Sequence, residues 1–198
     1  MNKKTFQIFN SRAVLTRAEG GDAPTRIEGY ASVFDQPSEL MFGVREYIDK
    51  DAFNDTDMTD VRALFNHDPN MMLGRTTSGT LEVRVDEKGL FYSVQLPDTQ
   101  VGNDVAALVE RGDISQSSFG FTIEEAAWEV KDGEDVYVIK KVGRLFDVSP
   151  VTFPAYPQTS VQARAMQEFY STIQKDFEAP AWRMAYAERR LQLTAKTV

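Results

Sequence analysis

The sequence predicts an α+β fold, in which a mostly antiparallel β-barrel or sandwich is accompanied by a few helices and followed by a helical C-terminal extension. Up to about residue 160, short runs of alternating apolar and polar residues are separated by turn residues, the pattern of half-buried antiparallel strands. Beyond Pro157 the apolar residues recur every three to four positions, which indicates amphipathic helix. We therefore divide the chain into a domain at residues 1–162 and an extension at residues 163–198.

The predicted strands begin with Arg26 to Phe34, where the alternation is clearest. Residues 80–85 and 90–96 flank the turn sequence Asp86-Glu87-Lys88-Gly89, which predicts a hairpin. Further strands are predicted at residues 61–66, 118–123, 136–141 and 142–148. The set is large enough to close into a barrel, which would leave no exposed sheet edge.

Two helices are predicted between these strands. The first, at residues 51–57, has little apolar spacing. The second spans residues 103–111 and is followed by Gly112, a residue that commonly ends helices. The serine-rich run at residues 115–121 comes next, so we expect it on a strand that the chain enters directly from the helix.

The extension differs from the domain in charge as well as in apolar period. Its first predicted helix has one apolar stripe, formed by Ala163, Met166, Phe169, Ile173 and Phe177. Residues 163–198 contain six Lys or Arg against four Asp or Glu, a net charge of +2, which leaves −10 for residues 1–162 out of the total of −8. We expect the two parts to meet different partners.

The composition is that of a soluble folded protein, with 42% apolar and 26% charged residues. Because cysteine is absent, disulfides, thiolate nucleophiles and cysteine-ligated metals are excluded, and a cytosolic location is the default. No apolar stretch approaches the roughly 20 residues that cross a bilayer, so no membrane partner is expected. The net charge of −8 repels phosphate backbones, so no nucleic-acid partner is expected either.

His67 is the sole histidine of the chain. A serine hydroxyl becomes a good nucleophile when a base takes its proton, and imidazole is the usual base near neutral pH. Any histidine-assisted chemistry must therefore use His67. The alternative is a structural histidine at a strand end, hydrogen-bonded to a nearby carbonyl.

Ser118 is the best candidate nucleophile in the serine-rich run. Alternate side chains of a strand share a face, so Ser117, Phe119 and Phe121 are expected on one face and Ser118 and Gly120 on the other. The two aromatic rings indicate that the first face is buried. The second face offers a hydroxyl beside a glycine, where a substrate backbone has room to approach. A strand with ordinary hydrogen-bonded hydroxyls is the alternative.

Asp147 is the candidate for the third group of a serine–histidine–acid site. A carboxylate at the ring nitrogen that faces away from serine fixes the imidazole tautomer and stabilises the imidazolium. Asp147 follows a predicted strand and stands between Phe146 and Val148. A solvent-facing carboxylate on an edge strand is the alternative for Asp147, and Asp113 or Glu124 would be the next candidates for the orienting group.

A metal site is the competing interpretation, because Asp49, Asp51, Asp55, Asp57 and Asp60 crowd one segment. Calcium loops need regularly spaced oxygen ligands and a glycine near the middle, which this segment lacks. We expect a solvated acidic loop, no metal and no cofactor.

Five sequence blocks, in this order, resemble the prohead maturation protease family of tailed bacteriophages. The blocks are Glu28 to Phe34, Phe65 to Asp68, Leu73 to Arg75, Ser118 to Phe121 and Leu145 to Pro157. They cover roughly residues 25 to 160. The resemblance implies a fold like that of herpesvirus assemblin, which is a β-barrel surrounded by helices.

The resemblance also implies the site residues. The histidine of the Asn-His-Asp block falls on His67, and the serine before Phe-Gly-Phe falls on Ser118. The third position of the family, usually a glutamate before Val-Ser-Pro, is Asp147 here, one methylene shorter. Residues 1–162 would then be a serine protease domain that forms an acyl-enzyme with a peptide substrate.

Such a protease is expected to cut major capsid protein, scaffold protein or both inside the prohead, within the cytoplasm of the bacterial host. The resemblance further implies self-processing that removes the extension at residues 163–198, and self-association is a separate expected contact. The alternative function is a catalytically inactive scaffold or capsid-assembly protein with the same fold. A metal-dependent hydrolase that uses the aspartate-rich segment is a third and weaker hypothesis.

Overall fold

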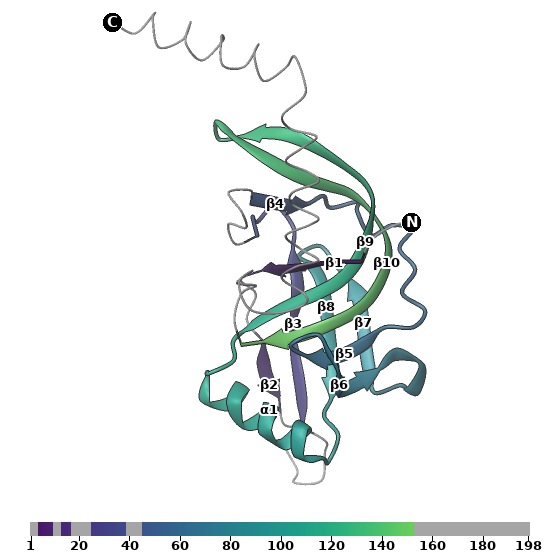
Figure 1. Ribbon diagram of the computed structural model, residues 1–198, viewed down its shortest axis with the longest axis vertical. Helices are drawn as coiled ribbons and strands as arrows, with labels where there is room; N and C mark the ends of the chain where they lie inside the picture. The colour runs from purple at the N-terminus through teal and green to yellow at the C-terminus, as the bar shows by residue number, and fades with distance from the viewer. Residues whose placement is uncertain (1–3, 10–12, 17–24, 39–44, 153–198) are drawn as a thin grey trace, which may run out of the picture. The chain divides into compact units, whose positions relative to one another are not determined.

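A computed structural model describes residues 4–9, 13–16, 25–38 and 45–152 (Figure 1). This described part contains ten strands, one α-helix and one short 3₁₀ helix, η1. The strands are β1 Lys4–Phe9, β2 Val14–Thr16, β3 Arg26–Val33, β4 Arg45–Ile48, β5 Arg62–Phe65, β6 Asp68–Arg75, β7 Leu81–Val85, β8 Gly89–Gln95, β9 Gln116–Lys131 and β10 Glu134–Val151. The helices are η1 Thr76–Ser78 and α1 Gln100–Arg111. The prediction of a mostly β, mostly antiparallel fold with few helices is confirmed.

The strands form two sheets. The larger sheet has the order β1-β9-β10-β5-β6, and β4 also pairs with β10. The smaller sheet has the order β2-β3-β8-β7 and contains the predicted hairpin of β7 and β8. All pairings are antiparallel except those that β10 makes with β4 and with β5, at opposite ends of its length. The candidate site residue Asp147 lies in the part of β10 that pairs with β5.

The described strands do not close into the predicted barrel. Between β6 and β7 the chain passes through η1 and then Gly79, whose φ of 72° is in the left-handed region that glycine adopts without strain. This connection directs β7 to the smaller sheet, where it pairs with β8. The result is two sheets with a shared core rather than one closed sheet.

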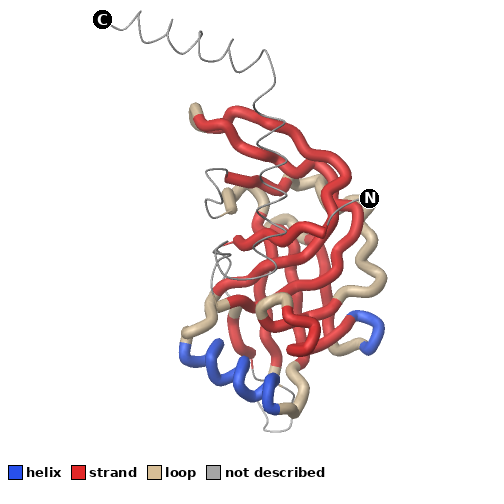
Figure 2. The backbone as a smooth tube through the Cα atoms, in the orientation of Figure 1, coloured by secondary structure: helices blue, strands red, loops and turns tan. Residues whose placement is uncertain are grey.

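The core lies between the two sheets and extends under α1. Its largest fully buried side chains come from both sheets and from the segment before β9; they are Tyr92, Phe119, Phe121, Ile27, Ile48, Leu73, Leu90, Ile114, Ile139 and Leu145. The hydroxyls of Tyr92 on β8 and Ser117 on β9 are 2.8 Å apart, so a buried hydrogen bond also joins the sheets. Figure 2 shows α1 in blue across one end of the strands. Its buried residues Val105 and Val109 belong to the same core.

Two predictions of local structure are wrong. Residues 136–141 and 142–148 belong to one continuous strand, β10, whose pairing with β9 is interrupted by bulges. Residues 51–57 form a series of turns instead of a helix. The carbonyl of Ala52 accepts a hydrogen bond from the amide of Val142 on β10, at 2.8 Å. Because that carbonyl is used by the sheet, it does not serve an intrahelical bond.

Helix α1 is confirmed but begins earlier than predicted, at Gln100. The hydroxyl of Thr99 accepts a hydrogen bond from the amide of Gly102, the usual role of an N-terminal cap. At the other end Gly112, with φ of 81°, terminates the helix, and β9 begins at Gln116. The serine-rich run therefore lies on a strand that follows the helix, as predicted. The predicted extension at residues 163–198, with its boundary at 162, is outside the described residues.

No helix in the described ranges is long and apolar enough to span a lipid bilayer.

Candidate active site

His67 lies in the tight turn that joins β5 to β6. Phe65 and Asp68 are direct cross-strand partners, so Asn66 and His67 are the two central residues of the turn. Their φ angles are 54° and 59°, the sign that a type I′ hairpin turn requires at both positions. Asparagine tolerates this left-handed conformation, whereas most other residues except glycine pay about 1–2 kcal/mol for it. His67 is thus at the tip of a hairpin rather than at the end of an extended strand.

The imidazole of His67 lies between a carboxylate and a hydroxyl. Its Nδ1 is hydrogen-bonded to Oδ1 of Asp147 on β10, and its Nε2 is 2.7 Å from Oγ of Ser118 on β9. A carboxylate only accepts, so Nδ1 carries the proton and Nε2 is the acceptor that faces the hydroxyl of Ser118. The side chains of His67 and Asp147 are 8% and 1% exposed. These three residues, which are distant in sequence, therefore have the arrangement of a serine, a base and an orienting acid.

The register of β9 and β10 explains why these groups meet. Ser118 is the direct partner of Ser149, and Gly120 is the partner of Asp147. Asp147 and Ser118 consequently share one face of the larger sheet. Ser117 points to the opposite face, where it bonds Tyr92. The predicted separation of the two serines is what the structure shows.

One part of that prediction is wrong, because the face with Ser118 is not open. Ser118 is 0% exposed and Gly120 is also buried. In this conformation a substrate carbonyl does not reach Ser118 without movement of the groups that cover it.

Ser149 is a site residue that the sequence analysis missed. Its Oγ donates to Oδ1 of Asp147 at 3.2 Å and lies 3.3 Å from Nδ1 of His67. Ser149 is fully buried. A local signal for it exists, since a residue two positions after Asp147 on a strand shares its face.

The other candidates for the orienting group lie elsewhere. Asp113 pairs with Arg111 at 3.2 Å, and Glu124 pairs with Lys141 at 3.4 Å. The Asp113 and Glu124 side chains are 46% and 43% exposed, in contrast to 1% for Asp147. Asp147 is hydrogen-bonded to Nδ1 of His67.

The aspartate-rich segment is tied to the larger sheet by ion pairs. The pairs are Asp49 with Lys140 (2.9 Å), Asp55 with Lys141 (3.4 Å), Asp57 with Arg144 (3.5 Å) and Asp60 with Arg75 (2.6 Å). Across the described ranges, no group of three or more histidine, aspartate or glutamate side chains is placed to hold a metal ion. The ion pairs therefore attach this aspartate-rich segment to strands β10 and β6.

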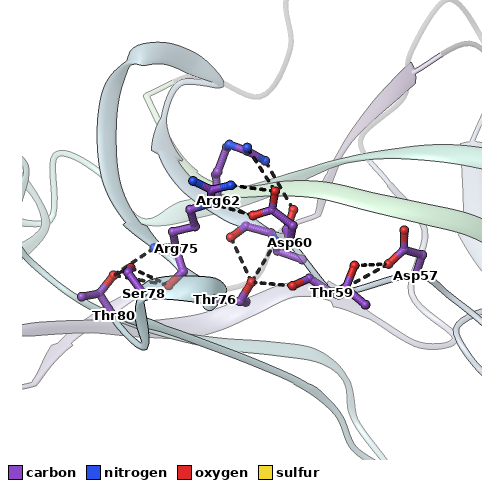
Figure 3. Close-up of polar contacts among 9 residues, drawn as sticks. Asp57, Thr59, Asp60, Arg62, Arg75, Thr76, Ser78 and Thr80 are labelled. Carbon is purple, nitrogen blue, oxygen red and sulfur yellow. Dashed lines mark hydrogen bonds and ion pairs between the residues drawn. The ribbon is translucent and has the colours of Figure 1, made fainter.

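Asp60 and Arg75 form the shortest of these pairs, in the network of Figure 3. Nε and Nη2 of Arg75 lie 2.6 and 2.8 Å from the two carboxylate oxygens of Asp60. These hydrogen bonds lower the pKa of Asp60 from 3.8 to about 2. Arg75 faces Arg62 across β5 and β6, and Arg62 faces Asp147 across β5 and β10. The ion pair therefore joins the chain just before β5 to the end of β6, and the His67 turn connects these two strands.

Comparisons with known proteins give a family and a fold. The model of the caudovirus prohead serine protease family matches residues 12–172. Among solved structures, the bacteriophage T4 capsid assembly protease, gp21, is similar with a TM-score of 0.51 and 12% identity, over 77% of this chain and 98% of that chain. At this identity the likeness is one of fold. No curated protein sequence matches the chain.

Proposed function

This chain belongs to the caudovirus prohead serine protease family, and from that premise we propose that it is a phage head maturation endopeptidase with His67, Ser118 and Asp147 as its catalytic residues. The resemblance drawn from the five sequence blocks is confirmed by the family match. The observation that carries the assignment of residues is the 2.7 Å contact between His67 Nε2 and Ser118 Oγ, with Asp147 on the other ring nitrogen.

The proposed reaction is acyl transfer through a covalent intermediate. Ser118 Oγ attacks the scissile carbonyl carbon while its proton passes to Nε2 of His67. The Asp147 carboxylate stabilises the imidazolium, which then gives the proton to the leaving amine as the peptide C–N bond breaks. Water hydrolyses the acyl-enzyme by the same steps, and His67 again takes and returns the proton.

The proposed substrates are the major capsid protein, the scaffold protein or both, cut inside the prohead in the host cytoplasm. Support comes from the family and from the name of the T4 relative, a capsid assembly protease. The proposed serine protease domain is residues 1–162. We also propose that copies of the chain self-associate and that self-processing removes residues 163–198; this extension begins before the family match ends at residue 172.

The test is co-expression with the capsid gene that neighbours this one, followed by intact-mass measurement of both proteins. Active enzyme shortens the capsid protein and loses its own extension, whereas Ser118→Ala leaves both chains at full length. Insensitivity to EDTA separates this reaction from metal-dependent hydrolysis. Assembly with a capsid protein that has the same mass with wild-type chain and with Ser118→Ala would identify an inactive scaffold or assembly protein instead.

A further inference from the structure

The turn that carries His67 has a preferred residue at its first central position, Asn66, but not at its second, His67. Two-residue turns of this kind prefer Asn-Gly, and His67 occupies the position where glycine is preferred. Such a conformation persists only where the surrounding structure holds it, and it is found mostly at functional sites. The contacts of the turn therefore show what holds His67 in place.

Asn66 joins the turn to the end of β10. Its side-chain Oδ1 accepts hydrogen bonds from the amide and from the hydroxyl of Thr152, at 2.9 and 3.1 Å. Its own amide donates to the carbonyl of Pro150 at 3.1 Å. Three hydrogen bonds from one residue thus fasten the hairpin tip to a strand with which this turn forms no ladder pair.

These hydrogen bonds reach the chain close to the residues of β10 that contact His67. Pro150 and Thr152 come one and three positions after Ser149, which contacts Nδ1 of His67 together with Asp147. The bonds of Asn66 therefore fix the turn relative to the strand that also supplies the carboxylate. They add to the contacts that the imidazole makes with Asp147, Ser118 and Ser149, and they hold a turn whose second position favours glycine.

We propose that Asn66 and Thr152 are positioning residues, which hold the left-handed turn so that His67 stays between Asp147 and Ser118. The proposal rests on the proposed role of His67 as the base that activates Ser118. Displacement of a reacting group by about 1 Å can cost on the order of a hundredfold in rate. A loosened turn is expected to have an effect of that size on chemistry and little effect on substrate binding.

Two substitutions at Asn66 separate its contacts from its backbone preference. Asn66→Gly keeps a residue that favours positive φ but removes the acceptor for Thr152. Asn66→Asp keeps both an acceptor oxygen and a tolerance of the left-handed region. Thr152→Val removes only the 3.1 Å hydroxyl bond and leaves the amide bond at 2.9 Å.

The first readout is labelling of Ser118 by a small alkyl fluorophosphonate in the full chain, with folding checked by circular dichroism. In Asn66→Gly the maximal labelling rate falls about tenfold to a hundredfold, with the half-saturating reagent concentration unchanged. Asn66→Asp restores the rate to within about threefold of wild type, and Thr152→Val lies between them. An Asn66→Gly variant that labels at the wild-type rate, or an Asn66→Asp variant as slow as Asn66→Gly, would overturn the proposal.

The second readout does not need activity. Because His67 is the sole histidine, ¹⁵N-histidine labelling of untagged protein gives NMR signals from this ring alone. We expect the ring signals to shift and broaden in Asn66→Gly and to return in Asn66→Asp. If wild-type protein neither labels nor cleaves, the proposed function fails while these spectra still decide the role of Asn66; unchanged spectra in Asn66→Gly would refute that role.

Discussion

Ser118 and Ser149 are direct partners across β9 and β10, and His67 lies close to both hydroxyls through different ring nitrogens. Nε2 is 2.7 Å from Ser118 Oγ, whereas Nδ1 is 3.3 Å from Ser149 Oγ and bonded to Asp147. Only the hydroxyl at Nε2 can give its proton to a ring whose Nδ1 already carries one. The two serines are therefore expected to respond differently to substitution.

Ser118→Ala is expected to abolish cleavage and fluorophosphonate labelling while the fold is retained. Ser117→Ala is the matched control one position away. Its hydroxyl bonds Tyr92, whose pKa is raised to about 12 by burial. Losing that partner leaves a buried hydroxyl unsatisfied and should lower the free energy of unfolding by about 1–3 kcal/mol, with labelling of Ser118 preserved. Denaturant titration and labelling rates measure the two effects. Labelling that survives Ser118→Ala would place the nucleophile elsewhere.

His67→Ala should remove nearly all activity without unfolding the protein. In sites of this kind, an enzyme that lacks one catalytic residue keeps a rate only about three to four orders of magnitude above that of the uncatalysed reaction in water.

Asp147→Asn should lower the maximal rate by about 10⁴-fold, since an amide no longer enforces the tautomer with the proton on Nδ1. Capsid-protein cleavage followed by mass spectrometry checks both variants. Full-speed cleavage by Asp147→Asn would show that another group orients the ring.

Ser149→Ala is expected to slow cleavage by about tenfold and to lower the melting temperature. Its hydroxyl donates to Asp147, a carboxylate that is 1% exposed, and hydrogen bonds to charged groups contribute about 1.5–3 kcal/mol. The residual activity distinguishes this supporting role from that of Ser118. The measurement is kcat against KM for a capsid-derived peptide. A variant as inactive as Ser118→Ala would show that Ser149 takes part in the chemistry directly.

The parts of the fold that were predictable are those whose pattern is local. Strand β3 and the hairpin of β7 and β8 alternate over short, clearly bounded segments, and Gly112 marks the end of α1. Strand β10 is different, because bulges disturb its alternation and make one strand look like two. The turns at residues 51–57 depend on a bond to Val142, far away in the sequence, which no local pattern reveals.

The candidate site divides in the same way. His67 and Ser118 stand out because one is the sole histidine and the other lies opposite two core aromatics on its strand. Ser149 and Asn66 act through contacts with residues more than 80 positions away. The spacing of Ser149 from Asp147 is a local signal, but these long-range contacts appear only when the turn after β5 lies beside β10. The burial of Ser118 is likewise a property of packing, which face alternation along one strand does not determine.

Asp60 gives the stability of this protein a specific dependence on pH. Its pKa is about 2 in the folded protein because Arg75 donates two hydrogen bonds to it, against 3.8 for a free aspartate. A lowered folded-state pKa means that the folded form binds the proton less tightly than the unfolded form. The stabilisation is therefore complete above about pH 4 and is lost as pH falls towards 2.

Asp60→Asn should accordingly lower the melting temperature at pH 6, and the difference from wild type should shrink as pH falls from 4 towards 2. Arg75→Gln removes the other partner. The double variant should lose less stability than the sum of the losses in the two single variants, and the difference measures the coupling between the two side chains. Thermal melts of the four proteins at several pH values measure that coupling. Because the pair is partly exposed, added salt should weaken the coupling as well. A coupling that stays constant from pH 6 to pH 3 would mean that Asp60 does not titrate against Arg75, and that the hairpin leading to His67 is held by packing and backbone bonds alone.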